Sequence, residues 1–249
     1  MFPYKDENPT YLTPVVTIGV IAANVLAWLL VQGAGTHEAL TRSVCELGAI
    51  PGELLGKLPP GTAVPLGPDL HCVLESTNYL DVVTSMFLHG GWMHLIGNMV
   101  FLWVFGNNIE DAMGHGRFVA FYLLCGVVAA AAQVLVHPES AIPMVGASGA
   151  ISGVLGAYLL LYPRVRVHTL VFFGFYATTI QLPAYLMLGY WIVLQFLGGA
   201  LAGLRSGGGV AYMAHIGGFI AGLLLIRLFA RRAYLERRPV HTAEYLHWR

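Results

Sequence analysis

The stretch PMVGASGAISGVLG places a serine, Ser148, among glycines and alanines at the start of an apolar run. A helix N-terminus carries unpaired backbone N–H groups that favour negative charge. A serine there could attack a carbonyl carbon while its own N–H helps to hold the oxyanion that forms. The alternative is structural, with Ser148 as a helix cap or a small packing residue. Other parts of the chain must decide between these uses.

A histidine, His215, lies a few residues inside a second apolar run, GGGVAYMAHIGGFIAGLLL. A neutral imidazole can take the proton of a serine as a general base, although a histidine can also simply hydrogen-bond across helices. Small residues recur at a spacing of four near both side chains: Gly149 and Gly153 in the first run, Gly218 and Gly222 in the second. Such faces let helices pack closely. We therefore expect the Ser148 hydroxyl to lie within reach of His215.

A third polar group lies in HGGWMHLIGNM, where His94 and Asn98 are four residues apart and share one helix face. Two side-chain donors on one face could hold an oxyanion, or the pair could stabilise a helix bundle. Zinc is the competing use of His94 and His215, but the sequence offers no third ligand near them. We expect neither a metal nor a cofactor. His89 is expected to lie at the membrane interface.

The composition places most of the chain in lipid. Of its 249 residues, 57% are hydrophobic and 10% are charged, with a mean hydropathy of +0.67, whereas soluble domains have about 25% charged residues. The zero net charge gives no reason to expect a nucleic-acid partner. The N-terminus lacks the pattern of a removable signal peptide, so the first apolar run is expected to be a retained membrane helix.

Six membrane spans are expected. They are residues 14–32, 92–105 and 118–136, a short span from 148 to the sequence LYPR, then 184–204 and 212–229. The second span is expected to fray into GNNIEDAMGHGR, with Glu110 and Asp111 as structural groups at its inner end. The apolar run before Pro183 is expected to be interfacial or re-entrant, because proline breaks a helix.

The distribution of arginines places both termini in the cytoplasm. The basic residues near the expected inner ends are Arg117, Arg164, Arg166, Arg227, Arg231, Arg232, Arg237 and Arg238, and Arg205 is an exception. The expected organisation is a cytoplasmic segment 1–13, a membrane domain 14–230 and a basic cytoplasmic tail 231–249. Loop 33–84 would face outward, could hold a small structured cap, and contains Cys45 and Cys72. These cysteines could form a disulfide there.

Together these motifs resemble the rhomboid family of intramembrane serine proteases. The resemblance covers residues 85–228 and rests on HGGWMHLIGNM, GASG and AHIGGFIAG, in this order. GNNIED also looks like the family's glycine-and-glutamate end of its second helix.

The resemblance implies an all-α membrane protein, a six-transmembrane-helix bundle with a long outward-facing first loop. Ser148 would be the nucleophile and His215 the general base of a catalytic dyad, while His94, Asn98 and the backbone N–H of Ser148 would form the oxyanion hole. Gly149, Gly153, Gly218 and Gly222 would pack the helices. The expected substrates are transmembrane segments of other proteins, cleaved near their outer ends, in a bacterial cell membrane.

One position departs from the family pattern. Many members carry a tyrosine four residues after the catalytic serine, stacked on the histidine, and here that residue is Ser152. Tyr158 or Tyr212 could take its place. Two other functions stay open: a catalytically inactive relative that binds membrane segments, and a small transporter. The natural substrate and the oligomeric state are not indicated by the sequence.

Overall fold

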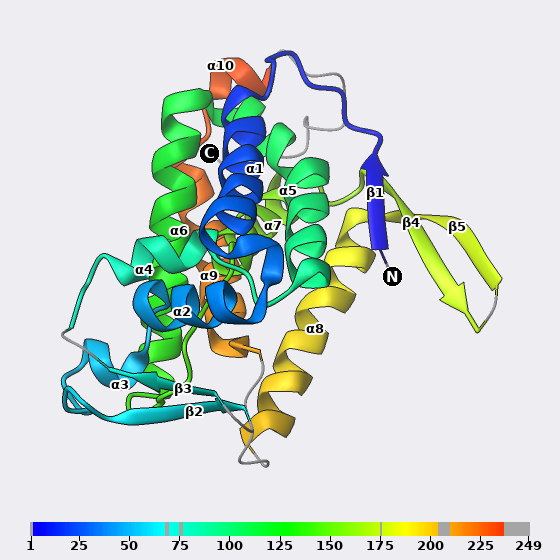
Figure 1. The fold of residues 1–249 in the computed structure, drawn as a ribbon. Coiled ribbons are helices and arrows are strands. Elements are labelled where there is room, and N and C mark those ends of the chain that lie inside the picture. The colour runs from blue at the N-terminus through cyan, green and yellow to red at the C-terminus, as the bar shows by residue number, and fades with distance from the viewer. Residues whose placement is uncertain (1, 68–69, 75–76, 175, 204–209, 237–249) are drawn as a thin grey trace.

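The computed structural model describes residues 2–67, 70–74, 77–174, 176–203 and 210–236 (Figure 1). The helices are α1 (Val15–Leu26), continued by a π-helical turn (Ala27–Val31), α2 (His37–Leu47), α3 (Pro51–Leu54), α4 (Asp81–Thr84), α5 (Trp92–Met113), α6 (His115–Val136), α7 (Ser148–Leu161), α8 (Ala184–Gly203), α9 (Tyr212–Phe229) and α10 (Arg232–Leu235). The strands are β1 (Phe2–Asp6), β2 (Ala63–Gly67), β3 (Leu70–Val73), β4 (Arg166–Phe173) and β5 (Tyr176–Pro183).

Helix α7, most of whose residues are buried, lies at the centre of the bundle and packs against α9, α6 and α5. Helix α9 also packs along α6, and α5 also packs against α1. Three described helices are long and apolar enough to cross a membrane: α6, α9 and the part of α8 from Ala184 to Leu201. Large apolar side chains on the bundle surface, such as Leu30, Leu135 and Leu228, are more than 70% exposed. A soluble monomer rarely exposes so much apolar surface. The chain is therefore a mostly helical membrane protein.

The expectation of an all-α fold is wrong. Strands β4 and β5 form an antiparallel hairpin, and β1 pairs with β4 on its other side. This sheet projects from the bundle on the side of α8 (Figure 1). The run before Pro183, expected to be interfacial or re-entrant, is this hairpin. Its residues are rich in β-branched and aromatic types, which favour strands.

The second long helix also differs from expectation. It begins at Trp92 as predicted, but instead of fraying beyond residue 105 it continues to Met113. Its last turns are buried against the N-terminal segment. Glu110 accepts hydrogen bonds from the backbone N–H groups of Val16 and Thr17 in α1, and Asp111 accepts from that of Leu12, before α1 begins. The expected structural role of these two carboxylates matches this arrangement.

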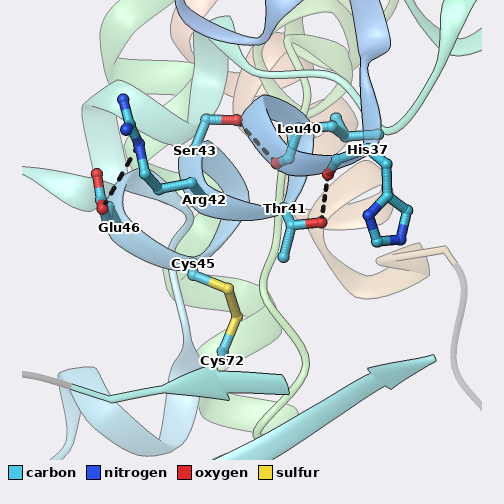
Figure 2. Close-up of a disulfide and its surroundings, with 8 residues drawn as sticks. All are labelled: His37, Leu40, Thr41, Arg42, Ser43, Cys45, Glu46 and Cys72. Carbon is cyan, nitrogen blue, oxygen red and sulfur yellow. Dashed lines mark hydrogen bonds and ion pairs between the residues drawn. A yellow bond between two sulfur atoms is a disulfide. The ribbon is translucent and has the colours of Figure 1, made fainter. Parts of the chain in front are cut away.

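The first loop, residues 33–84, contains its own small structure. Helix α2 and strand β3 are joined by the Cys45–Cys72 disulfide, whose Cα atoms are 5.3 Å apart (Figure 2). Ile50, Val64 and Leu74 bury a small core around Cys72. Arg205 and residues 237–249 of the expected basic tail lie outside the described residues.

Candidate active site

The two candidate catalytic side chains meet at one end of the bundle. Ser148 is the first residue of α7, and His215 lies in the first turn of α9. The distance from Ser148 Oγ to His215 Nε2 is 2.8 Å, which is a hydrogen bond across 67 residues of sequence. A serine hydroxyl in this position can pass its proton to the imidazole.

Close packing of α7 and α9 produces this contact. A Cβ on Gly218 would overlap the carbonyl oxygen of Gly149, and a Cβ on Gly222 would overlap that of Gly153. The α7 glycines make room on another side: a Cβ on Gly149 would lie 2.8 Å from the Cβ of Ala129 in α6. Gly218 and Gly222 of α9 therefore admit α7, whereas Gly149 of α7 admits α6.

A second device fixes the start of α9. The side-chain oxygen Oε1 of Gln133, in α6, accepts hydrogen bonds from the backbone N–H groups of Met213 and Ala214 at 3.1 and 3.3 Å. These N–H groups have no partner within their own helix. Gln133 thereby holds the turn from which His215 extends.

His94, in the first turn of α5, faces the same space as Ser148. A Cβ on Gly146 would lie 2.9 Å from His94 Nε2 and 3.4 Å from Ser148 Oγ. Gly146 has a φ of +128°, which a residue with a side chain rarely adopts. The glycine therefore keeps open a small volume between the imidazole and the hydroxyl.

Hydrogen bonding decides which nitrogen of His94 can donate. The backbone N–H of Gly90 donates to Nδ1 at 3.2 Å, so Nδ1 carries no proton. The proton of the neutral ring is then on Nε2, the nitrogen that faces Gly146. Asn98, one turn further along, is only 8% exposed, and its Nδ2 has no hydrogen-bond partner among the described residues. His94 Nε2–H can therefore donate to an anion beside Ser148, and Asn98 Nδ2–H is a buried donor one turn away that has no partner among the described residues.

Two hollows adjoin these groups. One, of about 40 Å³, is lined by Ser148 and Gly146, and a larger one, of about 300 Å³, is lined by His94 and Gln133. They share Met144, Val145 and Ala211 as wall residues. The candidate nucleophile and one candidate oxyanion donor therefore border open space rather than packed core.

Comparison with known proteins decides the family. A family model described as "Rhomboid domain" matches residues 76–232, more than half of the chain. The chain belongs to the rhomboid family. This stretch includes the polar groups of α5, α7 and α9 described above.

Curated rhomboid relatives are similar to a large part of the chain. The chain is 31% identical over 157 residues to "Rhomboid-like protein 11, chloroplastic" of Arabidopsis thaliana, covering 61% of this chain and 53% of the relative. It is 32% identical over 161 residues to "Rhomboid protease GluP" of Bacillus subtilis (strain 168), covering 65% and 28%. It is 30% identical over 155 residues to "Rhomboid protein 1, mitochondrial" of Saccharomyces cerevisiae, covering 59% and 41%. The chain thus spans about half or less of these relatives.

The rhomboid position that often carries tyrosine is filled differently here. Ser152 is fully buried, and its hydroxyl donates to the carbonyl oxygen of Ser148 at 2.6 Å. Of the two tyrosines that could take its place, Tyr158 packs against Phe105 and Tyr162 at the other end of α7. The ring of Tyr212 packs against Gly198 in α8, so closely that a Cβ on Gly198 would overlap it.

The aromatic ring beside His215 comes from α8 instead. The ring of Trp191 lies 5.9 Å from that of His215, between centroids. Gln195, one turn along the same helix, hydrogen-bonds to Nδ1 of His215 at 2.8 Å. Sequence reasoning missed both residues, together with Gln133. An uncharged amide inside an apolar span is a weaker signal than a charge, but it is still costly in lipid and could have directed attention to Gln133 and Gln195.

His89, expected to be interfacial, is enclosed by protein. Its side chain is fully buried and its ring lies edge-on to that of His94. Gln32 holds the His89 backbone from both sides, accepting from its N–H at 2.8 Å and donating to its carbonyl at 2.9 Å. His89 therefore packs against the His94 ring as part of the structure that holds it.

Proposed function

We propose that this rhomboid protein is an intramembrane serine endopeptidase that cleaves transmembrane segments by a Ser148–His215 dyad. The observation that carries the proposal is the 2.8 Å contact between Ser148 Oγ and His215 Nε2, beside a small volume that Gly146 keeps open. Relatives named as rhomboid proteases add support.

The proposed reaction follows from the groups at the site. Ser148 Oγ attacks the carbonyl carbon of the scissile peptide as His215 Nε2 accepts the hydroxyl proton. The oxyanion receives hydrogen bonds from His94 Nε2–H, Asn98 Nδ2–H and the backbone N–H of Ser148. His215 then gives its proton to the departing amine, and a water molecule hydrolyses the acyl-enzyme by the reverse transfers. No metal or cofactor takes part in this scheme.

The proposed setting is a membrane domain of six spans, residues 14–230, in a cell membrane of a bacterial type. Both termini, 1–13 and 231–249, would face the cytoplasm and loop 33–84 the outside. The disulfide in that loop supports an oxidising environment there. Substrates would be membrane proteins cut near the outer ends of their spans, where a helix must unwind before its carbonyls can be attacked.

The test is cleavage of a single-span substrate in vesicles containing the full chain. Ser148→Ala or His215→Ala should lower turnover about a thousandfold or more, because each removes a member of the reacting pair. A fluorophosphonate probe should label the unmodified protein and Ser152→Ala, a matched serine variant one turn away, but not Ser148→Ala. Undetectable cleavage by the unmodified protein, or cleavage that survives Ser148→Ala, would contradict the proposal. Binding of membrane segments without cleavage would favour an inactive relative.

A further inference from the structure

The second nitrogen of His215 has a specific partner outside the candidate dyad. Gln195 Oε1, in α8, lies 2.8 Å from His215 Nδ1. The Gln195 side chain is only 9% exposed, so little water competes for this contact. The third member of the chain of contacts therefore comes from a helix that supplies neither the serine nor the histidine.

The orientation of the Gln195 amide is set within its own helix. Its Nε2 donates to the carbonyl oxygen of Trp191, one turn earlier, at 3.1 Å. Rotating the amide by half a turn would place two oxygens against each other there. Oε1 is therefore the atom that faces the imidazole, and a carbonyl oxygen can only accept a hydrogen bond.

This orientation determines the tautomer of His215. Because Gln195 Oε1 accepts, His215 Nδ1 must carry the ring proton. In the neutral ring Nε2 is then unprotonated and can accept from the Ser148 hydroxyl 2.8 Å away. The opposite tautomer would direct a ring N–H at the hydroxyl and leave it without a base.

We propose that Gln195 is the positioning residue for the general base, holding His215 in the tautomer and orientation that Ser148 requires. The inference rests on the proposed protease function and extends it by naming what orients the histidine in this chain. Ser152 cannot do so, because it is buried and donates to the Ser148 carbonyl. A neutral amide supplies the acceptor without burying a charge in lipid.

Helix α8 contacts the histidine through a second residue, Trp191. The Trp191 ring lies 5.9 Å from the His215 ring at an interplanar angle of 40°, and 6.1 Å from that of Phe219, one turn further along α9. Trp191 limits where the imidazole can move, but a ring contact does not select between tautomers. Gln195 selects the tautomer of His215, so a measurement of the tautomer tests the role of Gln195.

The experiment compares the full chain with Gln195→Leu and Gln195→Glu in vesicles containing the single-span substrate. Gln195→Leu removes the acceptor while keeping an apolar side chain of similar size, so kcat should fall about tenfold with KM unchanged. Gln195→Glu should recover most of that loss as the protonated acid, which burial in lipid favours, because its O–H can donate to the Trp191 carbonyl while its carbonyl oxygen accepts from His215. Leu194→Ala is the matched control, because Leu194 is the preceding residue and its side chain is 41% exposed.

A spectroscopic measurement separates positioning from a purely structural role. Nitrogen NMR of 15N-labelled histidine, with the His215 signals assigned by their loss in His215→Ala, should find the proton on Nδ1 in the unmodified protein. Gln195→Leu should give a mixture of tautomers and Gln195→Glu should restore the Nδ1–H form.

The outcomes keep this inference distinct from the proposed function. Cleavage by the unmodified protein with an unchanged kcat in Gln195→Leu would overturn the role of Gln195 and leave the protease intact. A proton on Nε2 of His215 in the unmodified protein would overturn it as well, whether or not any variant folds. If the unmodified protein shows no cleavage that depends on Ser148, the proposed function is overturned. The tautomer measurement would still decide whether Gln195 places the ring proton on Nδ1 of His215.

Discussion

The two ends of α5 both carry buried polar side chains, yet they differ in how these side chains are satisfied. At the C-terminal end, the Glu110 carboxylate accepts from the backbone N–H groups of Val16 and Thr17, from the Thr17 hydroxyl, and contacts His115 Nδ1. At the N-terminal end, Asn98 Nδ2 has no partner among the described residues.

This difference separates groups that hold the fold from groups that are available for chemistry. The Glu110 carboxylate lies at the N-terminus of α1, where unpaired N–H groups and the helix dipole both favour it, so no binding capacity remains for a ligand. A buried donor without a partner costs free energy in the resting protein, and a developing oxyanion would satisfy it. Variants at the two ends of α5 should therefore differ in their effects, on stability at the C-terminal end and on turnover at the N-terminal end.

The largest expected effect is a loss of stability on substitution at the C-terminal end of α5, where the buried polar groups are hydrogen-bonded. Glu110→Ala should lower the free energy of unfolding by about 3 kcal/mol, because it strands N–H groups of α1 that were bonded to a charged acceptor. Thermal unfolding of the reconstituted protein measures this loss. Turnover per folded molecule should stay unchanged. Glu139→Ala is the control, since among the described residues the side chain of Glu139 makes a single exposed ion pair, with Lys57 at 3.5 Å. Equal stability of the two variants would contradict the assignment.

The next effect is a loss of turnover on substitution at the N-terminal end of α5. Asn98→Ala should lower kcat about a hundredfold, the loss typical of one oxyanion donor. Stability should be unchanged or slightly higher, because the variant removes a buried donor that has no partner. Cleavage kinetics and thermal unfolding of the same samples check both parts. Asn24→Ala, which changes a buried amide in α1, should affect stability alone. A stability loss in Asn98→Ala with normal kcat would place Asn98 among the structural groups.

The smallest effect at neutral pH concerns His89, which lies beside the site and is expected to act only on stability, below pH 6.5. Burial and, to a smaller extent, the neighbouring His94 together lower the pKa of His89 from 6.5 to about 3. Between these values the unfolded chain binds a proton that the folded chain does not, so stability is complete above pH 6.5 and falls as the pH drops towards 3. The slope from this one group should reach about 1.4 kcal/mol per pH unit.

The corresponding measurement is the unfolding free energy as a function of pH. His89→Gln should flatten the acid limb, because glutamine does not titrate, whereas His37→Gln, on the exposed first loop, should leave it unchanged. If the unfolding free energy of His89→Gln falls with decreasing pH as steeply as that of the unmodified protein, other groups cause the pH dependence.

Much of the helical framework could be predicted from hydropathy. The start of α5 at Trp92 and both ends of α9 at Tyr212 and Phe229 agree with the expected spans, because a long apolar run in lipid must satisfy its backbone within one helix. The sheet could not be predicted in this way. Strand β4 pairs with β1 from the N-terminus, and such pairing between distant segments leaves no local periodicity in either of them.

The sequence by itself determined the candidate chemistry and the family. Ser148, His215, His94 and Asn98 lie in three short motifs whose residue types and spacing restrict what they can do. It could not assign the neighbours of these groups. An amide in an apolar helix has the same local signature whether it faces lipid, a packing partner or an imidazole, so Gln195 and Gln133 carried no visible role. Only the tertiary structure decided that Gln195 meets His215 and that Glu110 meets α1, because hydrogen bonds depend on distances between helices, which the spacing of residues within one helix does not specify.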